Sequence, residues 1–104
     1  MASSEEYLQF ILEQLSGLEG ITFRKMMGEY LLYFQGKLFG GVYDDRLLVK
    51  PTELGKALMP HFREELPYPG AKKPMLLVEA LDDRAFLKQL VTAMAAELPE
   101  PKKH

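Results

Sequence analysis

The stretch from Ile21 to Lys50, ITFRKMMGEYLLYFQGKLFGGVYDDRLLVK, decides the fold of this chain. Two polar clusters, Gln35 to Lys37 and Tyr43 to Arg46, interrupt a run that is rich in aromatic and β-branched residues. Such interruptions are typical of hairpin turns, because Gly36 favours the positive φ of a tight turn and aspartate tolerates it. We therefore expect a meander of four short strands joined by three turns.

Side chains on both faces of this predicted sheet are largely apolar. Alternation along the second strand places Tyr30 and Leu32 on one face and Leu31 and Tyr33 on the other. Both faces should therefore be partly covered.

A glycine pair, Gly40 and Gly41, lies in the third strand, where large side chains are expected. Glycine inside a strand indicates a bulge or the close approach of another backbone segment. A small-molecule site at the same pair is the alternative interpretation.

The first predicted helix spans residues 3–17. Ser3 and Glu6 fit an S-x-x-E capping box, and apolar residues follow at helical spacing. A short second helix is expected at 53–59, capped by Thr52. Because Gly55 weakens that helix, packing by Leu54 and Leu58 must hold it.

The second half of the chain predicts a long loop, a fifth strand and a last helix. The loop runs from His61 to Pro74, with Tyr68 as a buried anchor whose hydroxyl is hydrogen-bonded. The strand covers residues 75–79, and Asp82 caps a helix at 83–98 that has one apolar stripe. We expect the polar tail at 100–104 to be disordered.

Together these elements predict one α+β domain, residues 1–104, with an antiparallel sheet of about five strands packed against three helices. The order along the chain is helix, four strands, helix, strand, helix. A chain of 104 residues with 47% hydrophobic content suits one core.

Composition restricts the compartment and the chemistry. The chain has no cysteine, begins with an acidic segment rather than a signal peptide, and has no apolar run of about 20 residues. We therefore expect a cytoplasmic protein with no membrane association. The two histidines, His61 and His104, have no metal-site spacing, and turn or cap chemistry explains the aspartate pairs. We expect no catalytic residues, no cofactor and no metal.

The predicted sheet is basic although the whole chain carries a net charge of −2. Five basic residues against three acidic ones give residues 21–50 a net charge of +2. With aromatic residues interleaved, this edge could bind single-stranded nucleic acid weakly, although Lys and Arg that merely solubilise strand ends would give the same pattern.

Several motifs resemble the N-terminal domain of the TfoX/Sxy competence-regulator family. They are R-K-M-x-G-x-Y at residues 24–30 and P-Y-x-G-x-K-K-P-M at residues 67–75, within a similarity that covers roughly residues 3 to 98. The resemblance implies an α+β fold and a bacterial, non-enzymatic role connected with gene regulation. The C-terminal helical domain of the competence regulators has no counterpart in these 104 residues, so we expect a stand-alone module.

The function expected from the sequence is therefore a regulatory or protein-interaction module with a protein partner. Weak nucleic-acid binding is a second hypothesis, a small-molecule-binding protein or enzyme is a third, and a homodimer is compatible with the two-faced sheet. The candidate interaction surface comprises Arg24, Lys25, Tyr30, Tyr68, Lys72 and Lys73.

Overall fold

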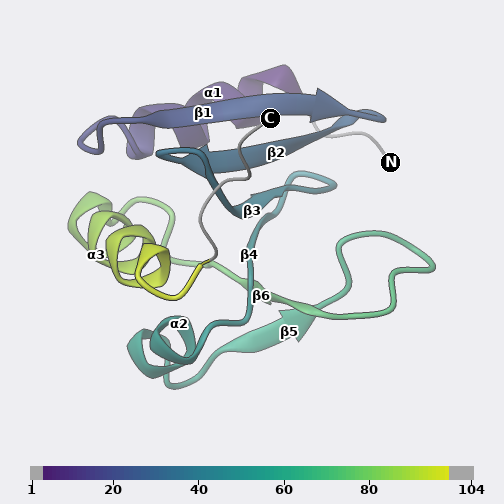
Figure 1. Ribbon diagram of the computed structural model, residues 1–104. Helices are drawn as coiled ribbons and strands as arrows, with labels where there is room; N and C mark the ends of the chain where they lie inside the picture. Colours follow the sequence, from purple (N-terminus) through teal and green to yellow (C-terminus); the bar gives the residue numbers. More distant parts are fainter. Residues whose placement is uncertain (1–3, 99–104) are drawn as a thin grey trace.

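The computed structural model describes residues 4–98, which form an antiparallel sheet of six strands (Figure 1). In spatial order the strands are β1 (Ile21–Met26), β2 (Glu29–Phe34), β3 (Lys37–Val42), β4 (Leu47–Val49), β6 (Met75–Leu77) and β5 (Arg63–Glu65). Within the same residues there are three helices, α1 (Glu5–Gln14), α2 (Glu53–Leu58) and α3 (Arg84–Ala95). The α+β class and the four-strand meander are confirmed. The tail at 100–104 lies outside the described residues.

Each hairpin of the meander turns through two residues with positive φ. Gln35 and Gly36 have φ of 52° and 83°, and Asp44 and Asp45 have φ of 51° and 54°, as the turn clusters predict. Flanking the last turn, Tyr43 and Arg46 exchange backbone hydrogen bonds of 2.9 and 3.0 Å. The remaining turn, Met27–Gly28, comes first along the chain and also has two positive φ angles, 51° and 84°.

The glycine pair in β3 serves both shape roles that the sequence suggested. The β2–β3 register shifts between Leu32 and Tyr33, which leaves Phe39 as the extra residue of a bulge. A Cβ on Gly40 would collide with the carbonyl oxygen of Leu48, so β4 approaches closely there. Because protein atoms fill the space beside the glycine, a bound small molecule is not needed to explain it.

The hydrophobic core lies between one face of the sheet and the helices. Tyr30, Leu32 and Phe34 of β2 point into it, and the remaining buried residues include Leu8 and Ile11 of α1. From α3 the predicted apolar stripe contributes Leu87, Leu90, Val91 and Met94. We call the opposite side of the sheet the open face. The register places Leu31, Gly41, Leu48 and Leu77 on it.

Two helix caps differ by one residue from the sequence prediction. Ser4, rather than Ser3, caps α1 and accepts a 3.1 Å hydrogen bond from Tyr7 N–H, while Ser3 lies outside the described residues. Asp83, rather than Asp82, caps α3 by accepting from the backbone of Phe86 at 3.0 Å. The first of several adjacent capping residues is therefore not always the one used.

The cap of α2 is confirmed, but part of its predicted packing is wrong. Thr52 accepts from Gly55 N–H at 3.0 Å, as expected. Leu54, however, is 42% exposed and does not hold the helix. Instead the carboxylate of Glu97, beyond the end of α3, accepts from the backbone N–H groups of Glu53 and Leu54 at 3.1 and 2.7 Å. A negative charge at this helix end is favourable.

The predicted loop from His61 to Pro74 contains a strand that the sequence analysis missed. β5 pairs antiparallel with β6 and forms the second edge of the sheet. Its sequence, Arg-Glu-Glu, has neither β-branched residues nor apolar alternation, so no strand signal is present. The irregular loop is therefore limited to residues 66–74, which extend away from α2 and α3 in Figure 1.

Candidate functional site

Tyrosines gather on the open face beside the β5–β6 loop. The rings of Tyr43 and Tyr68 have centroids 6.5 Å apart and are tilted by 46°. Tyr33 lies on the same face of β2 as Leu31, and it is close enough to Tyr43 to raise the pKa of that residue. We call Tyr33, Tyr43 and Tyr68 the tyrosine cluster.

The predicted burial of Tyr68 is wrong, because its side chain is 53% exposed. The preceding residue, Pro67, is buried instead. Proline restricts its own backbone and that of the residue before it. Tyr68 is thus presented at the surface by a loop whose adjoining residue is packed, and its ring contacts that of Tyr43.

Arg46 performs the anchoring that the sequence analysis assigned to Tyr68. Its guanidinium forms a 2.6 Å ion pair with Glu65 of β5 and donates to the carbonyl oxygens of Leu66 and Pro67, both at 3.3 Å. A planar guanidinium suits several acceptors at once. Nothing in the spacing of residues 46 and 65 reveals this contact, since it depends on the missed strand.

The electrostatic surroundings of the tyrosine cluster are acidic on one side. Burial raises the pKa of Tyr43 above its ordinary value of 10.0, and the neighbouring Tyr68, Glu29 and Tyr33 raise it further. The carboxylate of Glu29 also accepts from the backbone N–H of Asp44 at 3.2 and 3.3 Å. A phosphate placed on this side would face a carboxylate.

The structure does not bring the six predicted surface residues into one site. Tyr30 is only 7% exposed and packs in the core, 6.0 Å from the ring of Phe23, so it cannot contribute to a surface. Arg24 and Lys25 are exposed on β1 at one edge of the sheet. Lys72 and Lys73 are exposed in the same loop as Tyr68, which joins the strands of the other edge.

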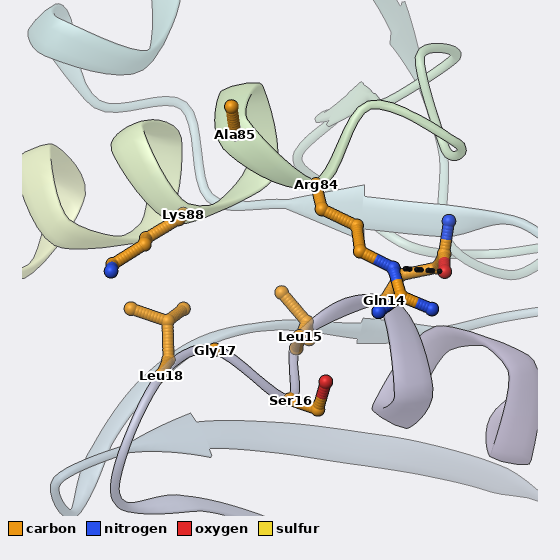
Figure 2. A pocket seen from close by; sticks show the side chains of 8 residues that line it. All are labelled: Gln14, Leu15, Ser16, Gly17, Leu18, Arg84, Ala85 and Lys88. Carbon is orange, nitrogen blue, oxygen red and sulfur yellow. Dashed lines mark hydrogen bonds between the residues drawn. The ribbon is translucent and has the colours of Figure 1, made fainter.

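A crevice of about 250 Å³ lies where the end of α1 meets the start of α3 (Figure 2). Its polar wall is already occupied by internal contacts. Gln14 donates to the carbonyl oxygen of Leu81 at 2.7 Å and accepts from Arg84 at 3.1 Å. Arg84 also lies 3.6 Å from Glu13. We interpret the crevice as part of the packing interface between α1 and α3 rather than as a ligand site.

The described residues, 4–98, contain no group of three or more His, Cys, Asp or Glu side chains placed to hold a metal ion. In the same part of the chain, no helix has the length and apolar character needed to cross a membrane.

The architecture defines a small α+β domain with helices on one face of an antiparallel sheet. Residues 13–97 match the TfoX N-terminal domain family, so the chain belongs to that family. It is also 32% identical, over 98% of its own length and 89% of the relative, to a protein of Spirochaeta aurantia described as an "Uncharacterized 12.7 kDa protein in trpE 5'region". No solved structure matches the chain.

Proposed function

We propose that this chain is a non-enzymatic regulatory module that acts by binding a protein partner through the tyrosine cluster and the β5–β6 loop. The observation that carries the proposal is the exposure of Tyr68 on a loop that Arg46 holds in place. Exposed aromatic residues held in one position are enriched among the residues that dominate binding energy at interfaces. Membership of the TfoX N-terminal domain family supports the regulatory part. The absence of cysteine supports a cytoplasmic location.

The partner should present carboxylates at the rim of its contact surface. Lys72 and Lys73 are exposed four and five residues after Tyr68 and can meet such groups at the rim of the interface. Glu29 beside Tyr43 favours a protein partner over a nucleic acid, because a phosphate backbone would be repelled there.

The test compares the wild-type protein with Tyr68→Ala as bait in the native host. Phe10→Ala is the matched control, since Phe10 is also an exposed aromatic residue, with a tilted ring contact of 6.4 Å to Tyr7 on α1. We expect wild-type and Phe10→Ala baits to retain the same protein and Tyr68→Ala to lose it. The retained protein should then bind purified wild-type chain directly.

Two results would overturn the proposal. One is retention of the same proteins by all three baits. The other is binding of labelled single-stranded DNA that Tyr68→Ala abolishes and that weakens steeply with salt, which would instead establish nucleic-acid binding. Deletion of the gene should change transcript levels if the module is regulatory.

A further inference from the structure

The two edges of the sheet differ in their protection against pairing with another strand. β5 has three residues, all charged, which is a common way to guard an edge. β1 is six residues long and exposes Phe23 and Met26, at 45% and 48%. Within residues 4–98, no strand pairs with the outer side of β1. The β1 edge is therefore the one that is open to strand addition.

Alternate residues of β1 direct their backbone groups to opposite sides. Gln35 N–H donates to the carbonyl oxygen of Gly20 at 2.8 Å, and this pair continues the β1–β2 register by one residue. Hydrogen-bonded pairs recur at every second residue of an antiparallel ladder, so the even-numbered residues of β1 bond to β2. The backbone N–H and C=O groups of Ile21, Phe23 and Lys25 therefore point outward.

A largely apolar groove of about 520 Å³ lies beside this edge, between β1 and α1, which is drawn behind β1 in Figure 1. Ile21, Thr22 and Phe23 line it from β1, and the other lining residues, from α1 and the segment that follows it, are Leu12, Leu15, Ser16 and Leu18. Because side chains alternate, a strand added to β1 would place every second side chain over the groove.

We propose that β1 pairs antiparallel with β1 of a second copy of this chain, about a two-fold axis at Phe23. The charges favour this register over the neighbouring one centred on Arg24. Centring the pair on Arg24 would set two guanidinium groups directly opposite each other, whereas centring it on Phe23 sets Arg24 opposite Thr22 and Lys25 opposite Ile21. The second register joins the outward backbone groups and forms one continuous sheet, with the symmetry usual for homodimers.

A second copy fits the charges at the ends of β1 better than an acidic partner does. Glu19 is exposed just before the strand, and Lys25 is exposed near its end. Antiparallel pairing about Phe23 sets Lys25 of each copy opposite Ile21 of the other, two residues along the chain from Glu19, so charges of opposite sign lie near one another at both ends. An acidic segment of another protein would match Lys25 but would face Glu19 with like charge.

The first test is the mass of the wild-type chain by sedimentation equilibrium over a range of concentrations, with Phe23→Pro for comparison. Proline is tolerated on an edge strand where its missing N–H would face away from the sheet, so the ladder to β2 should survive. We expect a dimer for wild type and for the control Phe10→Ala, and a folded monomer for Phe23→Pro. A wild-type monomer at every concentration overturns the proposal.

The second test determines the register of the β1–β1 pair and does not depend on proline being tolerated. Because the chain has no cysteine, Thr22→Cys and Arg24→Cys can be mixed and oxidised. Opposed residues lie within the Cα separation that a disulfide spans, so we expect the mixed disulfide to exceed both symmetric ones. Predominance of a symmetric disulfide, or none at all, overturns the proposal. The result is independent of the proposed function, since neither variant alters the tyrosine cluster.

Discussion

The ring of Tyr43 lies against the backbone of Gly41, so closely that a Cβ on Gly41 would stand 2.8 Å from Cε2 of that ring. The same Cβ would stand 2.5 Å from the carbonyl oxygen of Tyr30. The absence of a side chain at residue 41 thus allows the aromatic ring to settle on the open face. Tyr68 then packs on that ring, so the surface proposed to bind a partner rests on a glycine.

Gly41→Ala should destabilise the protein by about 1–3 kcal/mol, the usual cost of overpacking a filled site. The measurement is the free energy of unfolding from urea titration. Gly17→Ala is the control, because nothing lies within 4 Å of a Cβ built there. We expect the control to be neutral or slightly stabilising, since alanine reduces the entropy of the unfolded chain. Equal effects of the two substitutions would refute the close contact at Gly41.

Arg46→Lys should release the β5–β6 loop while preserving the charge. A lysine cannot reproduce the contacts to Glu65 and to two carbonyl oxygens at once. The loss in stability should be about 1 kcal/mol, because the ion pair is 28% exposed on each side and is partly screened. Limited proteolysis and hydrogen exchange of residues 66–74 should both accelerate.

Arg63→Lys is the matched control for that substitution. Arg63 is 64% exposed, and its carboxylate contacts are long, at 3.9 and 4.0 Å. We expect no change in cleavage of the loop. If Arg46→Lys and Arg63→Lys behave alike, Arg46 does not anchor the loop.

Tyr68→Ala should change the free energy of unfolding by no more than about 0.5 kcal/mol, as is usual for an exposed side chain. A buried anchor would cost roughly 3 kcal/mol or more. Phe39→Ala provides the scale, because Phe39 is fully buried in the core and should cost about 3–5 kcal/mol. A loss of 3 kcal/mol for Tyr68→Ala would show that the ring is packed in solution.

Alkaline pH should destabilise the protein through Tyr43. Its pKa is raised in the folded state, so the folded protein holds the phenolic proton more tightly than the unfolded chain does. The resulting contribution to the free energy of unfolding is fully present below pH about 10. It is lost as the pH rises from there through the folded-state pKa of Tyr43. Tyr43→Phe should lose less stability than wild type over that range.

The titration of Tyr43 itself can be measured by recording tyrosinate absorbance against pH and subtracting the curve of Tyr43→Phe from that of the wild type. Removing the neighbouring phenol with Tyr68→Phe should lower the pKa of Tyr43. Among the neighbouring groups that raise this pKa, Tyr68 has the largest effect. An unchanged titration would mean that the two rings do not interact.

Local signals predicted most of the fold because its hairpins are encoded locally. Asp44 and Asp45 adopt positive φ inside the expected turn, and β2 alternates as its sequence indicates. β5 escaped prediction because Arg63, Glu64 and Glu65 form a strand only through pairing with β6. An edge strand can be fully charged, so its sequence resembles that of a loop.

The candidate site was harder to predict, because it depends on contacts distant in sequence. The sequence analysis selected Tyr68 but predicted that it is buried, whereas its exposure follows from Arg46 holding the loop from another strand. Tyr30 alternates with Tyr33 on β2, and only the position of the helices decides which of the two is buried. Lys72 and Lys73 are exposed, and their role in binding stays a prediction.

The contact between Glu97 and the start of α2 has a consequence for synthesis of the chain. α2 has six residues, too few to be stable alone, and its first backbone N–H groups are bonded by a carboxylate made more than forty residues later. Lys37 of the meander likewise donates to the carbonyl oxygen of Ala95 at 2.9 Å. Neither contact can form until Ala95 and Glu97 have left the ribosome, so the start of α2 and the contact of Lys37 are completed late in folding.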